Sequence, residues 1–337
     1  MDYEISLSPS NKNVLGNSEE AVLDSLLTAG IAIKYNCSNG SCGKCRARLI
    51  SGELQHQHHD FHFKEHEKSM GNFLMCRCTP KSDIHIEADL IGSVEDVPEQ
   101  NIATKVYKIE QPSDDVRVIT LRTPRSHTLQ FLAGQHIRLS IDGLKPRNKS
   151  IASCPCNGRY LQFHFNRQEE DEFTDYIFNE LGNKATVDVT GPYGSFVFDE
   201  QSPRPIVLIA TETGFAPIKS LAEHIFALEV SQPIYLYWCV QNNQDDYFSN
   251  YCRAWLASED NFSYQKLALD ELGISGTMDT EQAQNRLAEK ISEQFPDLSA
   301  HDVYLSGPRE RFETLISNFC NNGLPQERLS VDSMQRY

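Results

Sequence analysis

The first part of the chain combines short β-like stretches with one amphipathic helix. In YEISLSP (3–9) and IHIEADL (84–90), apolar and polar residues alternate with a period of two, which predicts half-buried strands. CRARLISGEL (45–54) shows the same alternation. EEAVLDSLLTAGI (19–31) has apolar residues at helical spacing and predicts a helix that ends at Gly30. The pattern indicates a small α+β domain.

The middle of the chain predicts an antiparallel barrel. GSVEDVPEQ (92–100) is polar and contains a proline, as linkers do. Three strand-like runs follow, ATKVYKIEQ, VRVITLRT and QHIRLSI, and turn residues separate them at short spacing. Closely spaced strands joined by turns are typical of antiparallel barrels.

The last third predicts a doubly wound α/β domain. PRPIVLIATETGFAPIKSLAEHIFAL (203–228) is an apolar run, a turn and then an amphipathic helix. This strand–loop–helix order opens a parallel sheet with helices on both faces. PIYLYWCVQ (233–241) predicts a second buried strand, DDYFSNYCRAWL (245–256) a helix, and DVYLSGPRERFETLISNF (302–319) a final strand, loop and helix.

Length and charge narrow the class of protein. A chain of 337 residues exceeds one hydrophobic core, so two or three domains are expected. The net charge of −16 argues against binding nucleic acid through its phosphates. The first residues do not resemble a signal peptide, and no apolar run is long enough to span a bilayer. We therefore expect a cytoplasmic protein with reduced thiols, whose ten cysteines serve metal or iron–sulfur ligation rather than disulfides.

Four cysteines have the spacing of a two-iron cluster site. NCSNGSCGKC (36–45) holds three of them, and FLMC (73–76) supplies the fourth. The order C-x4-C-x2-C…C is the plant-type [2Fe–2S] spacing, and glycines let the loop backbone wrap the sulfurs. A zinc site or a group of free thiols are the alternatives, but zinc loops favour repeated short cysteine pairs. The predicted ligands are Cys37, Cys42, Cys45 and Cys76, with Cys78 a bystander on the opposite face of a strand.

A histidine-rich segment, HQHHDFHFKEHEK (56–68), lies between the third and fourth ligands. His58, His62 and His66 are four residues apart, so one helix face could carry all three and bind zinc or nickel. A solvated polar segment is the favoured interpretation, and we assign no metal ligand here.

These motifs resemble two known families joined in one chain. Residues 1–93, with the loop C-x-x-G-x-C-G-x-C, resemble a plant-type ferredoxin. PRNKSIASCP (146–155) resembles the R-x-Y-S motif of the ferredoxin–NADP reductase family, and TGPYGSF (190–196) its GPxGxF segment. The resemblance implies that Arg147 meets the FAD pyrophosphate and that Ser150 bonds the flavin. Lys149 stands where the family has tyrosine.

Two further loops continue the resemblance. FHFNRQEEDEFTDYIFNEL (163–181) is similar to the family's pyrophosphate-binding strand and helix, with Thr174 matched and acids at 169–172 in place of glycines. ATETGFAP resembles the family's GGTGxAP dinucleotide loop, with Glu212 at a usually small position. The resemblance implies that Ser306, beside Gly307, lies near the nicotinamide. The nicotinamide-dinucleotide contacts it implies are Thr213, Gly214, Ala216, Pro217 and Gly307. Cys239 and Gln241 replace the family's glycine and arginine, which favours NADH over NADPH.

The whole chain is therefore similar to the ferredoxin-fused flavin reductases, near those that serve 3-deoxysugar formation or multicomponent oxygenases. The expected domains are 1–93 (β-grasp plant-type ferredoxin), 94–101 (linker), 102–200 (FAD-binding antiparallel β-barrel) and 201–337 (doubly wound NAD(P)-binding domain). The resemblance implies that electrons pass from NAD(P)H through FAD to the cluster and then to a partner protein, an oxygenase or dehydrase component. The alternative is a degenerate reductase that acts as a [2Fe–2S] carrier or interaction module with weakened or lost FAD and NAD binding.

Overall fold

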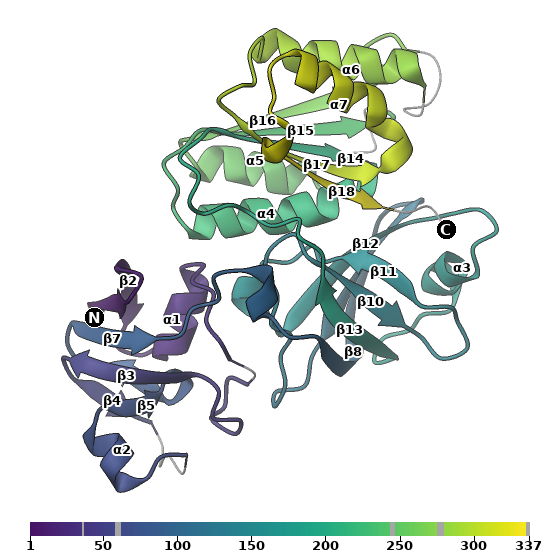
Figure 1. Ribbon diagram of the computed structural model, residues 1–337. Coiled ribbons are helices and arrows are strands. Elements are labelled where there is room, and N and C mark those ends of the chain that lie inside the picture. The colour runs from purple at the N-terminus through teal and green to yellow at the C-terminus, as the bar shows by residue number, and fades with distance from the viewer. Residues whose placement is uncertain (36, 58–61, 243–246, 275–279, 335–337) are drawn as a thin grey trace.

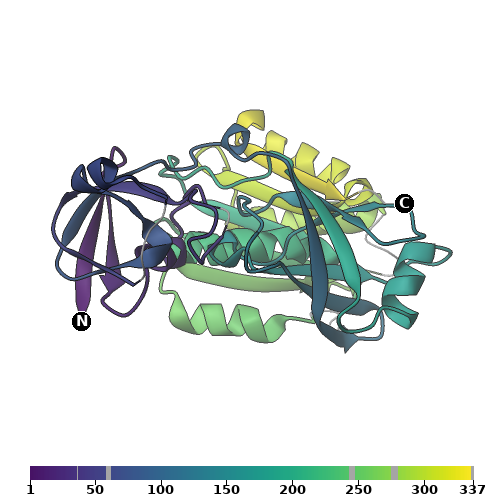
Figure 2. The same cartoon turned by 90° about the horizontal axis from the view of Figure 1, so that it is seen from below.

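The computed structural model builds the chain from three units, each around its own sheet (Figure 1). It describes residues 1–35, 37–57, 62–242, 247–274 and 280–334. Within those residues, no helix is long and apolar enough to cross a bilayer. Seen from below, the N-terminal unit lies at one end, and the other two units lie against each other (Figure 2).

The N-terminal unit is a mixed sheet covered by one helix. Strand order is β2-β1-β7-β3-β5, with β1 and β7 parallel and the other pairs antiparallel. The apolar side of α1 packs on the sheet through Val22, Leu23 and Leu26. The elements are β1 (Asp2–Ser8), β2 (Lys12–Asn17), α1 (Val22–Thr28), β3 (Arg46–Ser51), β4 (Leu54–His56), α2 (Glu65–Ser69), β5 (Asn72–Leu74), β6 (Cys78–Pro80) and β7 (Ile84–Ala88).

The middle unit is a six-stranded antiparallel, barrel-like sheet. Its order is β11-β10-β13-β8-β9-β12, and alternate side chains fill a core that α3 closes. Asp171 is the N-cap of α3 and accepts hydrogen bonds from two backbone N–H groups there. The elements are β8 (Gln100–Ser113), β9 (Val116–Arg122), β10 (His136–Ser140), β11 (Arg147–Ser150), β12 (Tyr160–Asn166), α3 (Glu172–Asn179) and β13 (Thr186–Tyr193).

The C-terminal unit is a parallel sheet between two helix layers. Its order is β16-β15-β14-β17-β18, and every residue of the central strand β14 is buried, because helices cover both faces. The elements are β14 (Ile206–Thr211), α4 (Phe215–Ala227), β15 (Ile234–Val240), α5 (Ser249–Ser258), β16 (Phe262–Ala268), α6 (Glu281–Gln294), β17 (Asp302–Pro308), α7 (Glu313–Asn321) and β18 (Leu329–Met334).

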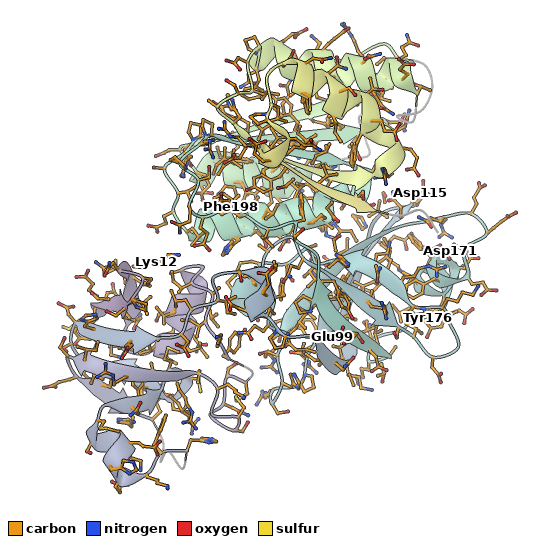
Figure 3. The ribbon with its side chains drawn as sticks, in the orientation of Figure 1. Lys12, Glu99, Asp115, Asp171, Tyr176 and Phe198 are labelled. Carbon is orange, nitrogen blue, oxygen red and sulfur yellow. A yellow bond between two sulfur atoms is a disulfide. The ribbon has the colours of Figure 1, made fainter. Side chains whose placement is uncertain are left out.

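Buried polar contacts join the three units. Gln130 of the barrel-like unit donates from Nε2 to the carbonyl of Ile33 in the N-terminal unit at 2.7 Å. Ser220 of α4 donates to the carbonyl of Ser153 at 2.8 Å. Lys12, labelled in Figure 3, lies on the side of the N-terminal unit that faces the C-terminal unit. Because these contacts are specific, the N-terminal unit is held against the other two.

Most predicted elements are confirmed, and two expectations are wrong. The first concerns the C-terminus: the sequence predicted that the strand in 302–319 is the final one, but a further strand, β18, follows it. Cys154 and Cys156 form a disulfide, whereas the cysteines were expected not to. The reason is local: the short turn Pro155–Asn157 brings their Cα atoms to 5.3 Å, within the range that a disulfide spans.

Candidate functional site

The four predicted cluster cysteines lie in the N-terminal unit as two close pairs. Cys37 Sγ is 3.1 Å from Cys42 Sγ, and Cys45 Sγ is 3.2 Å from Cys76 Sγ. A two-iron cluster needs this arrangement, because each iron takes two thiolates beside the bridging sulfides. Among the described residues, no group of three or more His, Cys, Asp or Glu side chains is placed to hold a single metal ion.

The loop around these cysteines favours a thiolate at Cys37. Gly40 and Gly43 have φ values of 78° and 66°, a region that glycine adopts without strain. The Cys42 N–H lies 3.3 Å from Cys37 Sγ, and the Ser41 hydroxyl 3.5 Å. Burial acts to raise the pKa of Cys37, but these hydrogen bonds outweigh it and lower the pKa to about 7. Cys37 is therefore the sulfur of its pair that favours the deprotonated form, whereas the pKa of Cys42 is raised, mainly by burial.

The histidine segment does not form the helix face that its spacing allowed. Helix α2 begins at Glu65, so His62 precedes it and His66 lies within it, while His58 is outside the described residues. His62 Nε2 is instead 2.7 Å from the carbonyl oxygen of Gly40 in the cysteine loop. Cys78 lies in β6 beside His56 Nδ1 at 3.3 Å and belongs to neither thiol pair. This histidine contact with the loop had no signal in the sequence.

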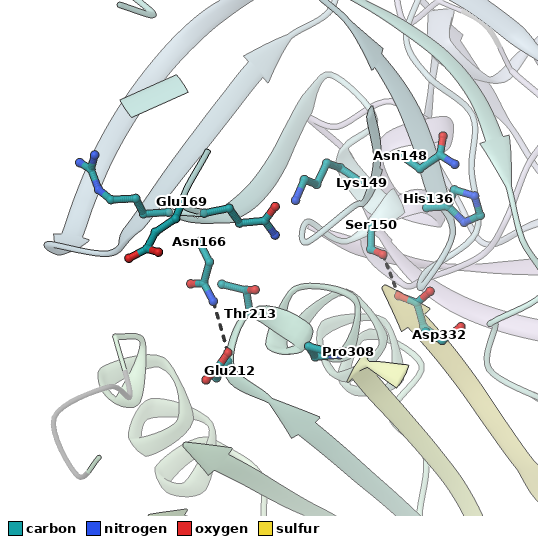
Figure 4. Close-up of a pocket in the computed structure, with 13 residues that line it drawn as sticks. His136, Asn148, Lys149, Ser150, Asn166, Glu169, Glu212, Thr213, Pro308 and Asp332 are labelled. Carbon is teal, nitrogen blue, oxygen red and sulfur yellow. Dashed lines mark hydrogen bonds between the residues drawn. The ribbon is translucent and has the colours of Figure 1, made fainter. Parts of the chain in front are cut away.

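A cavity of about 660 Å³ lies where the barrel-like unit meets the C-terminal unit (Figure 4). Its size is that of a cofactor site. Ser150 and Thr213, both predicted from sequence, line it from opposite units. Other lining residues are His136 of β10, Asn166 at the end of β12, Gln168 and Glu169 of the loop that follows, Pro308 at the end of β17, and Asp332 of β18.

Asp332 links two of the predicted residues and was missed by the sequence reasoning. Ser150 Oγ donates to Asp332 Oδ2 at 2.7 Å, and Ser306 Oγ lies 3.5 Å from the same oxygen (Figure 4 shows the first bond). Burial raises the pKa of Asp332, and the nearby His136 and the two hydroxyls oppose that rise only in part. A strand-like alternation at 329–334 was the available signal. Ser306 itself is fully buried, and Pro308 forms the cavity wall beside it.

Lys149 replaces an aromatic residue of the family with a charge. Its Nζ lies 5.0 Å from the centre of the Phe165 ring, a cation–π contact. Among the residues that the structure describes, this ammonium has no hydrogen-bond or ion-pair partner, and its side chain extends into the cavity (Figure 4). Burial lowers the pKa of Lys149 to about 8, although the carboxylate of Asp171 acts in the opposite direction.

Arg147 and Thr174 meet at the start of α3, but an internal acid already binds both. Arg147 Nη2 is 2.8 Å from Asp171 Oδ1, and the Thr174 N–H is 3.4 Å from Asp171 Oδ2. The residue before, Glu170, has a φ of 59°, which glycine would adopt without strain. The acidic run 169–172 stands where the family has glycines, and Asp171 of that run points at donors that a phosphate would use.

The dinucleotide loop is built on close backbone approach. A Cβ on Gly214 would lie 2.2 Å from the carbonyl oxygen of Ser306, so only glycine fits there. Ala216 and Pro217 form the buried first turn of α4, and Gly307 has a φ of 150° between Ser306 and Pro308. Glu212 has a φ of 48°, and its Oε2 accepts from Asn166 Nδ2 at 3.4 Å across the cavity. The loop after β14 and the end of β17 therefore pack backbone against backbone at the edge of the cavity.

Comparisons with known proteins decide the family. Three family models match in order, the 2Fe-2S iron-sulfur cluster binding domain at residues 5–81, the oxidoreductase FAD-binding domain at 103–198 and the oxidoreductase NAD-binding domain at 208–317. Protein RfbI of Salmonella typhimurium is 30% identical over 336 residues, 99% of this chain and 97% of that protein. The chain belongs to the ferredoxin-fused flavin reductases.

Other relatives of this reductase agree. The CDP-6-deoxy-L-threo-D-glycero-4-hexulose-3-dehydrase reductase of Yersinia pseudotuberculosis is 29% identical over 99% of this chain and 98% of its own. Reductase component 1 of a Comamonas terephthalate 1,2-dioxygenase is 26% identical over 93% of this chain and 91% of its own. The Amycolatopsis cytochrome P450 reductase GcoB shares the fold, with a TM-score of 0.63 at 22% identity over 98% of both chains.

The predicted family, fold class, function, enzyme class and cofactors are confirmed. The reductase is an NAD(P)H-dependent oxidoreductase with [2Fe–2S], FAD-binding and NAD-binding domains, and it passes electrons from NAD(P)H through FAD to the cluster and on to a partner protein. The roles of individual residues and the domain boundaries stay predictions.

Proposed function

We propose that this reductase takes electrons from NADH and delivers them singly to a dehydrase that removes an oxygen from a nucleotide-linked sugar. The relatives that support this are 29–30% identical over 99% of the chain, and one of them is named a hexulose dehydrase reductase. An oxygenase component is the other partner class, supported by a relative at 26% identity. The net charge of −16 favours a partner with a basic docking face.

The cavity between the two C-terminal units is the observation that carries this proposal. Ser150 and Thr213 face each other across it, so a flavin ring and a nicotinamide can meet there. A bound flavin supplies the step from two-electron to one-electron chemistry. Ser150 would hold the flavin edge, while its hydroxyl donates a hydrogen bond to Asp332 and Ser306 Oγ lies 3.5 Å from the same carboxyl oxygen. We propose Ser306 as the catalytic residue of the nicotinamide side.

The remaining predicted residues hold phosphates and thiolates in this proposal. Arg147 and Thr174 face the flavin pyrophosphate, while Gly214, Ala216, Pro217 and Gly307 shape the dinucleotide cradle. Cys37, Cys42, Cys45 and Cys76 bind the cluster. We propose that the ferredoxin domain spans 1–93, the FAD-binding domain 102–200 and the NAD(P)-binding domain 201–337. The linker 94–101 connects the first two. We also propose a cytoplasmic location, where such a thiol loop stays reduced.

One spectrum tests the proposal. Protein purified without oxygen should show cluster absorption bands and release about one FAD per chain when the cofactors are counted. NADH should then bleach the absorption of both the flavin and the cluster, and NADPH should bleach them more slowly. Cluster bands without flavin, even after incubation with FAD, would instead support the carrier function. That outcome would leave the family assignment intact and remove the NADH-dependent activity.

A further inference from the structure

Asp171 already fills the position that an anion would take at the start of α3. Its carboxylate lies 2.8 Å from Arg147 Nη2 and within 3.4 Å of the N–H groups of Phe173 and Thr174. A guanidinium and two N–H groups at a helix start are the donors that a phosphate group uses. Asp171 is 7% exposed, so these donors are enclosed as well as occupied.

The carboxylate of Asp171 is ionised at neutral pH. Burial acts to raise its pKa, but the hydrogen bond and positive charge of Arg147, followed by the two N–H groups, outweigh burial and lower the pKa. Its charge also reaches the cavity, since it acts on the pKa of Lys149, whose side chain lines the cavity wall. Lys149 and Arg167 line the cavity itself, but an anion that reaches the start of α3 meets the negative charge of Asp171.

The loop that carries Asp171 borders the same cavity. Gln168 and Glu169 line the cavity, and Glu170 then turns the chain with a φ of 59° into the N-cap of α3. Thr174 Oγ1 donates to the carbonyl of Gln168 at 3.3 Å, which closes the loop on itself. Figure 3 labels Asp171 beside α3. Asp171 is not among the residues that line the cavity, so a flavin ring bound there would not touch it, whereas phosphates bound by Arg147 and the N–H groups of α3 would have to displace it.

Resting on the flavin site proposed above, we infer that Asp171 is a specificity-determining residue. It competes with the phosphates of a flavin nucleotide for Arg147 and for the N-terminal N–H groups of α3. The reductase then gains little from those phosphates and holds FAD reversibly, with an affinity close to its affinity for riboflavin. Hydrogen bonds to charged groups of this kind change an affinity about tenfold to hundredfold each.

Binding of three flavins to the full chain tests the inference. Riboflavin, FMN and FAD would each be titrated by fluorescence quenching against the wild type, Asp171→Asn and Glu172→Gln. Asparagine keeps the size and the capping ability of aspartate but loses its charge. Glu172 is the next residue and is exposed, so its variant is a matched loss of one acid. Cluster absorption and the thermal midpoint confirm that each variant folds.

The expected result depends on the phosphates. Asp171→Asn should tighten FAD and FMN about tenfold to hundredfold and leave riboflavin nearly unchanged, because only the phosphates compete with the carboxylate. Glu172→Gln should change none of the three more than about threefold, because exposed charges contribute little. In the wild type, the three flavins should bind within about tenfold of one another.

Other results overturn the inference in distinguishable ways. If riboflavin binds but Asp171→Asn gives no gain for FAD, the flavin function stands and the role of Asp171 falls. If the wild type binds FAD more than about a hundredfold more tightly than riboflavin, the flavin function again stands and the role of Asp171 falls. If Asp171→Asn tightens the binding of all three flavins equally, the effect comes from general electrostatics and not from competition with the phosphates. That result would also refute the inference. If no variant binds any flavin, the proposed function fails together with it.

Discussion

The ammonium of Lys12 lies 2.6 Å from the carboxylate of Glu200, although 188 residues separate them in the chain. Lys12 belongs to the ferredoxin-type unit, and Glu200 follows the barrel-like unit. The same carboxylate lies 3.6 Å from Nε2 of His224 on α4. One acid therefore contacts residues of two other units at their junction.

Glu200→Gln should weaken this junction in a pH-dependent way. Burial acts to raise the pKa of Glu200, but His224 and Lys12 lower it from 4.5 to about 2. The folded protein therefore binds fewer protons here than the unfolded chain, so this stabilisation is present above about pH 4.5 and is lost as the pH falls toward 2. Because Glu200 is 30% exposed, we expect a loss of about 1–2 kcal/mol at pH 7.

Urea unfolding at pH 7 and at pH 3 measures the Glu200 effect. The difference between wild type and Glu200→Gln should shrink at the lower pH. Glu19→Gln is the control, since the exposed Glu19 side chain has no hydrogen bond or ion pair among the described residues. A Glu200 variant as stable as this control at pH 7 would show that the carboxylate does not hold the units together.

Lys149→Met should stabilise the protein at neutral pH. Burial lowers the pKa of Lys149 from 10.5 to about 8, so the unfolded chain binds more protons than the folded one between those values. Wild-type stability therefore rises with pH across that window, whereas the methionine variant lacks that rise. With allowance for its partial exposure, removing the charge should gain about 2–3 kcal/mol at pH 7.

Denaturant unfolding at pH 7 and at pH 10 checks the Lys149 prediction. The gain from Lys149→Met should be largest at pH 7 and decline toward pH 10. Lys145→Met removes an exposed charge four residues earlier and should have little effect at either pH. A loss of stability at pH 7 would mean that the contact with the Phe165 ring outweighs the cost of burial.

Cys42→Ser should abolish the cluster, because serine leaves Cys37 without its partner thiolate. Visible absorption measures the cluster directly. NADH-dependent reduction of ferricyanide, which can accept electrons from the flavin, should survive, while reduction of cytochrome c should fall to background. Cys78→Ser is the matched control, since Cys78 lies outside both thiol pairs. Intact cluster bands in the Cys42 variant would refute the ligand assignment.

Gly214→Ala should damage the dinucleotide loop, because the new Cβ would lie 2.2 Å from a backbone oxygen of Ser306. Overpacking of this kind costs about 1–3 kcal/mol, and we expect a raised KM for NADH as the loop shifts. Gly182→Ala adds the same methyl group where no atom lies within 4 Å. Steady-state NADH oxidation and thermal unfolding of both variants measure the effect. Equal behaviour of the two variants would contradict it.

The sequence predicted the features that depend on neighbours along the chain. Cysteine spacing identified the four cysteines that the structure brings together as two pairs, and alternation identified the strands, since both are local properties. Asp332 was missed because its place beside Ser150 depends on β18 joining the sheet next to β17. The acidic residues 169–172 were evident in the sequence, but which of them contacts Arg147 was not. Only the structure shows that Asp171 turns inward while the exposed Glu172 does not.

The contact between Asp171 and Arg147 also bears on the order in which the protein is assembled. Cofactor pockets often hold a charge that stays unsatisfied until the ligand arrives, and such apoproteins are unstable. Here the guanidinium and the start of α3 are already neutralised by the chain itself. This corner of the barrel-like unit therefore needs no phosphate to balance the charge of Arg147, and its local folding does not depend on flavin.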